Sequence, residues 1–93
     1  MTVMILERVP ASLRGEISRW LLEPHTGVFV GSVKSTVRTR LWARVCAGMK
    51  GGAGILLYEA NNEQGFDIEF WGGTNRSVID FDGLKLIQVP KAE

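Results

Sequence analysis

The spacing of apolar residues predicts a strand and then a helix at the start of this 93-residue chain. Residues 2–6 form a short apolar run that ends shortly before Pro10, which is typical of a buried strand. Over residues 11–23 the apolar side chains instead recur every three or four positions between two prolines, which predicts an amphipathic helix. The apolar stripe of this helix consists of Leu13, Ile17, Trp20 and Leu21.

The remaining pattern predicts four more strands and a second helix. Residues 26–30 are β-rich and bracketed by glycines, which predicts a strand. A helix capped by Ser32 should follow and end before Gly51, because apolar residues repeat there at helical spacing. The later predictions are strands at 55–60 and 66–71 joined by a turn, a polar loop at 72–77, a turn at 80–83 and a last strand at 84–89.

This order of elements indicates an α+β sandwich in one domain spanning residues 1–93. A mainly antiparallel sheet should carry two helices on one face, with an added C-terminal strand. The nearest common architecture is ferredoxin-like, whose strict order is βαββαβ. The predicted order has one strand displaced from that form, so we expect a deviation in topology.

Composition narrows the class of protein. At 45% hydrophobic and 23% charged residues the chain should fold, but a domain this short has a thin core, so we expect it to associate with other subunits. Its aliphatic runs are far shorter than a membrane span, and the N-terminal residues do not read as a signal peptide. A cytoplasmic protein with no membrane partner is the expectation.

The charge of the chain is unevenly distributed. The formal net charge is +1, but residues 1–50 carry +5 and residues 51–93 carry −4. Arginines such as Arg40 and Arg44, one helical turn apart, would create a positive field that attracts phosphate groups. The alternative is an ordinary pair of solvated helix faces, and charge alone leaves both interpretations open.

Few residues qualify as catalytic. Cys46 is the only cysteine and His25 the only histidine, which argues against a zinc site and against a cysteine nucleophile. Glu7, where the first strand ends, is a candidate ligand for Mg²⁺, a cation that binds carboxylate oxygens. A single carboxylate makes a poor site, but a two-fold dimer would supply two. The alternative is a solvated acid or one paired with Arg8.

Five motifs, in this order and spacing, resemble the small CRISPR-associated adaptation protein of type I-E systems, the second Cas protein. The resemblance spans nearly the whole chain. The motifs are Val9-Pro10-x-x-Leu13-Arg14-Gly15, Trp20-Leu21-Leu22-Glu23, Gly27-Val28-Phe29-Val30-Gly31, Gly65-Phe66 and Asp80-x-Asp82-Gly83-Leu84.

The resemblance implies a ferredoxin-like homodimer that bridges two dimers of the CRISPR integrase and holds double-stranded DNA for spacer acquisition in antiviral defence. The DNA-backbone contacts of the family fall on Arg14 and Arg76. Other basic residues of related proteins are absent here, where the chain has Ser12, Thr36 and Asn75. Two expectations remain open: either Arg38, Arg40 or Arg44 supplies the missing contacts, or the chain binds the DNA backbone more weakly.

The resemblance also implies an integrase-docking segment and an alternative activity. The docking segment is residues 79–89, with the apolar side chains Ile79, Leu84, Leu86, Ile87 and Val89. Many members of the wider family are described as metal-dependent endonucleases acting on RNA, including single-stranded RNA, or on DNA. Their shared aspartate falls on Glu7, so the alternative is a Mg²⁺-dependent endonuclease with paired Glu7 side chains as catalytic metal ligands.

Overall fold

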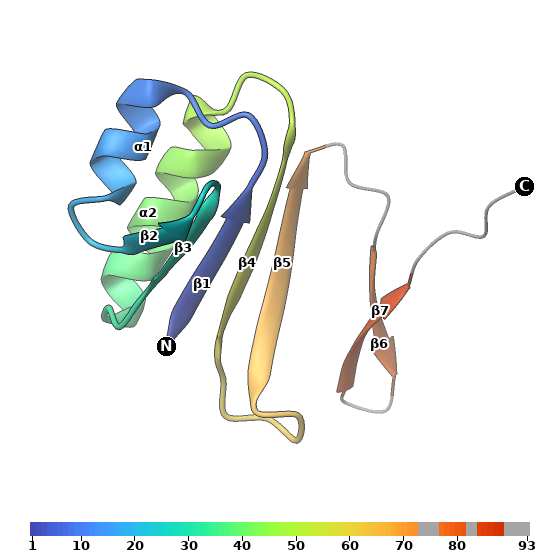
Figure 1. The fold of residues 1–93 in the computed structure, drawn as a ribbon. Helices are drawn as coiled ribbons and strands as arrows, with labels where there is room; N and C mark the ends of the chain where they lie inside the picture. The colour runs from blue at the N-terminus through green and yellow to red at the C-terminus, as the bar shows by residue number, and fades with distance from the viewer. Residues whose placement is uncertain (73–76, 82–83, 89–93) are drawn as a thin grey trace, which may run out of the picture.

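The computed structural model describes residues 1–72, 77–81 and 84–88, and in the last two stretches only the course of the chain. Its first six elements follow the order βαββαβ, and a seventh element continues the sheet (Figure 1). They are β1 (Thr2–Leu6), α1 (Ala11–Ile17), β2 (Leu22–His25), β3 (Val28–Gly31), α2 (Ser35–Gly48), β4 (Ala53–Glu59) and β5 (Phe66–Gly72).

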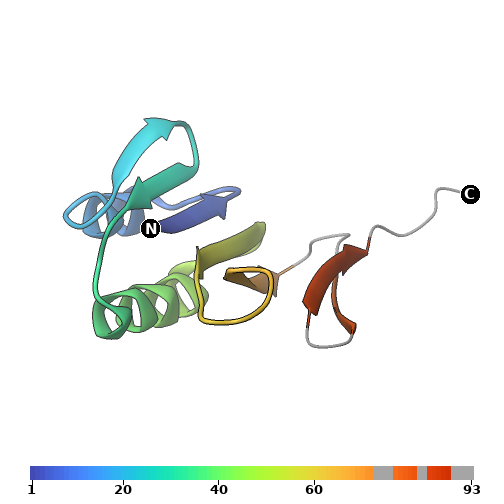
Figure 2. The ribbon, with the colours of Figure 1, turned by 90° about the horizontal axis from the view of Figure 1, so that it is seen from below.

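The main sheet has five strands in the order β2-β3-β1-β4-β5, and every neighbouring pair is antiparallel. Both helices pack on one side of this sheet, as the two views show (Figures 1 and 2). The predicted α+β class and the ferredoxin-like arrangement are therefore confirmed. Neither helix of the described part of the chain is long and apolar enough to cross a bilayer.

The first helix is shorter than the sequence predicts. The residues after it form β2, which is the strand missing from the predicted order. Helix α1 ends at Ile17, whose carbonyl oxygen accepts hydrogen bonds from the backbone N–H groups of Trp20 and Leu21 at 3.0 and 2.9 Å. The chain then enters β2, at the edge of the sheet. Pro24 is tolerated there because an edge strand can do without one backbone N–H donor. Trp20 consequently lies on the surface, 56% exposed, and not on the predicted buried stripe.

Helix α2 also starts later than predicted. The chain is extended up to Lys34, which occupies the N-cap position without a side-chain hydrogen bond, so the predicted cap at Ser32 is wrong. The helix ends at Gly48, before the predicted glycine stop. Its buried residues Leu41, Trp42 and Val45 keep the predicted spacing, so the helix itself is confirmed.

The core lies between the helices and the sheet. Strand register places Met4 between Phe29 of β3 and Leu56 of β4, and these three side chains are almost fully withdrawn from solvent. The helices cover them with apolar side chains of their own. These are Leu13 and Ile17 from α1, and Leu41, Trp42 and Val45 from α2.

The opposite side of the sheet is also apolar, because the alternate residues of each strand point away from the helices. Val3 is paired with Val30 and Leu57, and Ile5 with Val28 and Ile55. We call this side the open face; it consists of Val3, Ile5, Leu22, Val28, Val30, Ile55, Leu57, Phe66, Ile68 and Phe70, and of these Ile68 is buried. Three of the most exposed large apolar side chains of the described residues lie on it, namely Ile5, Leu22 and Phe66.

The predicted last strand does not join the main sheet. It is β7 (Leu84–Gln88), which pairs with β6 (Ser77–Phe81) in a separate two-stranded sheet (Figure 1). Asp80 belongs to β6 and pairs with Lys85, so the predicted turn at 80–83 begins too early. Val89 lies outside the described residues.

Candidate functional site

Two glycine turns hold the end of β1, where Glu7 lies. The backbone N–H of Leu6 donates to the carbonyl of Gly27 at 2.7 Å, and that of Glu7 to the carbonyl of Ala53 at 2.9 Å. A Cβ atom at Gly27 or Gly52 would lie 2.4 Å from the carbonyl oxygen of Leu6 or Glu7 respectively, and both glycines have positive φ. No side chain fits at either position, so the strand end is held closely by backbone alone.

Glu7 lies one residue beyond β1, at the edge of the sheet. It stands two positions after Ile5, its backbone N–H still bonds Ala53 of β4, and its side chain is exposed. The next residue, Arg8, has φ of 60°, a left-handed conformation that is uncommon for a residue with a side chain and often occurs at functional sites. The carboxylate is therefore displayed at a strained bend, on a rigid element.

Within one copy, the described residues do not form a magnesium site around Glu7. The described residues contain no group of three His, Cys, Asp or Glu side chains able to hold a metal ion. Glu7 alone offers too few oxygen ligands, because protein-bound Mg²⁺ needs carboxylates together with waters and substrate phosphates. A metal site at Glu7 would require a second carboxylate from another molecule of the chain.

Arg14 lies in a shallow depression beside β2. Its Nε atom is 3.2 Å from Oε2 of Glu23, and the same oxygen accepts a hydrogen bond from the backbone N–H of Gly27 at 2.9 Å. Pro24 to Thr26 form the rest of the depression. Glu23 thus connects the guanidinium of Arg14 to the glycine turn that also holds the end of β1.

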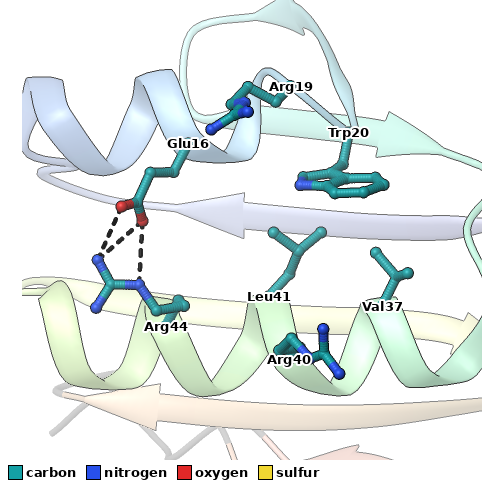
Figure 3. Close-up of a pocket in the computed structure, with 7 residues that line it drawn as sticks. All are labelled: Glu16, Arg19, Trp20, Val37, Arg40, Leu41 and Arg44. Carbon is teal, nitrogen blue, oxygen red and sulfur yellow. Dashed lines mark hydrogen bonds and ion pairs between the residues drawn. The ribbon is translucent and has the colours of Figure 1, made fainter.

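Arg44 joins the two helices. Its Nε and Nη2 atoms donate to the carboxylate of Glu16 at distances between 2.9 and 3.1 Å, a bidentate pair (Figure 3). This contact closes one end of a groove between α1 and α2 with a volume of about 240 Å³. We call it the interhelical groove; its lining residues are Glu16, Arg19, Trp20, Val37, Arg40, Leu41 and Arg44.

Arg38 lies against the sheet and does not line the interhelical groove. Its guanidinium carbon lies 3.8 Å from the ring centre of Tyr58, on β4, whose hydroxyl donates to Oε2 of Glu69 at 3.2 Å. Burial, followed by the negative charge of Glu69 and then of Asp67, raises the pKa of Tyr58, so this phenol stays protonated and acts as a donor.

The structure therefore brings together only some of the predicted DNA contacts. Arg40 and Arg44 line the interhelical groove, whereas Arg14 and Arg38 lie in two other places. Arg76 and Val89 lie outside the described residues. Of the predicted docking residues, Ile79 lies on β6 and the other three on β7, namely Leu84, Leu86 and Ile87.

Sequence reasoning missed Trp20 and Arg19 as groove residues. A helix predicted to continue to residue 23 places Trp20 in the core. The helix in fact ends at Ile17, and Pro24, a residue found in edge strands, is the signal that could have indicated this earlier end. Cys46 is half-buried, and burial, with a smaller contribution from Glu69, raises the pKa of its thiol. A protonated thiol is a weak nucleophile.

One comparison with known proteins bears on this geometry. The family model described as CRISPR-associated protein (Cas_Cas2CT1978) matches residues 1–86. The match includes every element of the main sheet, both helices, Glu7 and the whole interhelical groove.

Proposed function

Because the chain belongs to this CRISPR-associated family, whose role lies in CRISPR adaptation, we propose that it is the DNA-binding scaffold of spacer acquisition. In this role a cytoplasmic homodimer bridges integrase dimers and holds double-stranded DNA by its phosphate backbone. The type I-E branch is the one that its sequence motifs resemble.

The observation that carries the proposal is the way in which acidic side chains hold the arginines. Glu16 fixes Arg44 with two parallel hydrogen bonds, from Nε and from Nη2, and Glu23 lies against Arg14. An arginine has five N–H donors, so each keeps donors for a phosphate after one carboxylate is bound. Side chains already held in place lose less entropy when they bind a duplex.

The open face supports a homodimer. A large apolar surface on a small domain is stabilised when a second copy covers it. The sheet that carries Ile5, Leu22 and Phe66 would pack against the same sheet of the partner. The β6–β7 hairpin then remains available to dock the integrase through Ile79, Leu84, Leu86, Ile87 and Val89.

Duplex binding tests the scaffold directly. Arg14→Ala combined with Arg76→Ala should weaken binding of a labelled DNA duplex at least about tenfold in an anisotropy titration, and should flatten the dependence of affinity on salt. Lys50→Ala, another exposed cation of the basic half, is the matched control. An affinity unchanged by the double substitution at moderate salt would exclude these residues as the DNA contacts.

Integrase bridging needs its own experiment. The integrase should co-purify with the wild-type chain and not with a Leu86→Asp, Ile87→Asp variant, while a spacer-integration assay with Glu7→Ala should keep its activity. Loss of integration with Glu7→Ala, with the complex intact, would contradict a purely scaffolding role.

A Mg²⁺-dependent endonuclease is the second candidate, and the position of Glu7 favours it. Glu7, one residue beyond β1, continues the alternation of Val3 and Ile5, so a dimer across the open face would bring two carboxylates toward one another. The purified chain should then cleave single-stranded RNA or duplex DNA, and should lose this activity in chelator and with Glu7→Gln. Cleavage that survives Glu7→Gln would exclude Glu7 as the metal ligand.

A further inference from the structure

The interhelical groove combines an exposed aromatic ring with arginines that have no carboxylate partner. Figure 3 shows the indole of Trp20 above Val37 and Leu41, whose side chains point toward it from α2. Glu16 neutralises Arg44, but among the described residues no ion pair is found for Arg19 or Arg40. The groove therefore has an apolar wall and an excess of two positive charges.

An exposed indole of this kind is unusual in a chain with so little core. Trp20 is 56% exposed, although burial of an aromatic ring is a large source of stability for a small domain. Of the other two tryptophans, Trp42 is buried in the core and Trp71 is partly buried against it. Trp20 is thus the one tryptophan that the described fold leaves open for a ligand.

The size of the groove limits what it can accept. Its volume of about 240 Å³ is below the range of about 300–1,000 Å³ typical of small-molecule sites, so it takes one planar group and not a helix. A flat ring that stacks on the indole and carries its own anionic group would use both features at once. A nucleotide has this chemistry, because its base stacks on aromatic side chains and its phosphate binds guanidinium groups.

A second hollow beside the groove favours a strand over a free nucleotide. It shares Arg40 with the groove and is otherwise lined by Ser35, Thr36, Thr39 and Ala43. Its hydroxyl groups are donors suited to the next phosphate of a backbone that passes over Arg40. The two hollows thus provide places for successive nucleotides along α2.

We propose that the interhelical groove binds one unpaired nucleotide of a single nucleic-acid strand, with its base on the indole of Trp20 and its phosphate between Arg19 and Arg40. This site goes beyond the proposed duplex scaffold, because paired bases in a duplex present no free ring face to the indole. The site would hold the strand where it leaves the double helix.

A fluorescence titration with short oligothymidylate tests the site. Binding should quench the emission of the wild-type chain, and Trp20→Leu should remove the quenching and weaken binding of the labelled strand at least about fivefold. Trp71→Phe, which leaves the groove intact, should change neither result by more than twofold. Trp20→Tyr keeps a stacking ring and should restore part of the affinity.

The probe itself separates stacking from charge. An abasic strand of the same length should bind to the wild type at least about fivefold more weakly than oligothymidylate. The two strands should bind to the Trp20→Leu variant with equal affinity. Arg19→Gln should weaken both strands, with Lys34→Gln as the charge control outside the groove. Circular dichroism should show that each variant is folded.

Three results would overturn the proposal. The first is equal binding of abasic and base-carrying strands by the wild type, and the second is single-strand affinity unchanged by Trp20→Leu in a folded protein. The third is quenching of Trp20 by an acidic phenylalanine-containing peptide and not by oligothymidylate, which would identify a protein-docking groove. Duplex affinity, measured with Arg14→Ala and Arg76→Ala, reports separately on the scaffold.

Discussion

Adjacent residues of β1 have opposite surroundings on the two sides of the sheet. Met4 is fully buried between Phe29 and Leu56 beneath the helices, whereas Ile5, beside it in sequence, is 39% exposed on the open face. In β1, β3 and the middle of β4 both sides carry apolar side chains at alternate positions, whereas the helix side of β5 also carries Asp67 and Glu69. Along β1 the two sides therefore differ mainly in their cover.

This comparison explains the composition of the chain. A hydrophobic content of 45% is more than one thin core between a sheet and two helices needs. The surplus lies on the open face, at the alternate strand positions where a sheet that faced water would carry polar residues. Apolar composition in so short a chain therefore carries information about assembly as well as about folding.

The largest expected effect comes from the covered side. Met4→Ala should lower the free energy of unfolding by about 2–5 kcal/mol, because the surrounding core side chains cannot close the cavity that it leaves. Urea denaturation followed by circular dichroism measures the change. A loss below 1 kcal/mol would mean that the helix side is not the better packed one.

The matched change on the open face should act on association. Ile5→Lys should abolish the proposed dimer in analytical ultracentrifugation, since a buried charge opposes packing of two apolar sheets. The stability of the single fold should change by less than about 1 kcal/mol, as expected for a half-exposed site. Ala47→Lys places the same charge on exposed helix surface and should leave the dimer intact. A dimer that survives Ile5→Lys would contradict the assigned interface.

A smaller effect is expected from the contact that joins the two covering helices. A double-mutant cycle with Glu16→Ala and Arg44→Ala should give a coupling energy below about 1 kcal/mol, because both side chains are about half exposed to solvent. The coupling should decrease at high salt. A coupling of several kcal/mol would show that this pair, and not the apolar core, keeps α1 and α2 together.

The smallest expected effect is on the reactivity of Cys46 in α2, whose thiol is influenced by the negative charge of Glu69 in β5. Because burial and then the charge of Glu69 raise the pKa of the thiol, alkylation by iodoacetamide should begin at higher pH than for a free cysteine. Glu69→Gln should move the pH profile part of the way back, and Glu63→Gln should not move it. A profile like that of free cysteine would show that Cys46 is not covered.

Strand periodicity made most of this fold predictable, and the failures have a common cause. Residues 66–71 alternate clearly and residues 2–6 form a short apolar run before Pro10, so the sequence predicts β5 and β1 to within a residue. It does not predict β2, because Trp20 and Leu21 extend the helical spacing, and pairing with β3 overrides it. Only Pro24 hinted at an edge strand.

The candidate site was less predictable, because its contacts join residues far apart in the sequence. The sequence indicated that Arg40 and Arg44 lie one turn apart, but not that Glu16, twenty-eight residues away, binds Arg44. The stacking of Arg38 on Tyr58 likewise depends on how α2 crosses the sheet. Periodicity assigns a residue to a face, whereas packing decides its neighbours.

The glycine turns around the end of β1 have a consequence for mutational screens. In a saturation library, nearly every replacement of Gly27 or Gly52 would collide with the backbone of Leu6 or Glu7 and shift that strand end. Both glycines would score as intolerant, whether or not the nearby carboxylate does chemistry. Only a variant that changes the Glu7 side chain and leaves the two glycine turns intact can distinguish a catalytic carboxylate from a structural requirement at this strand end.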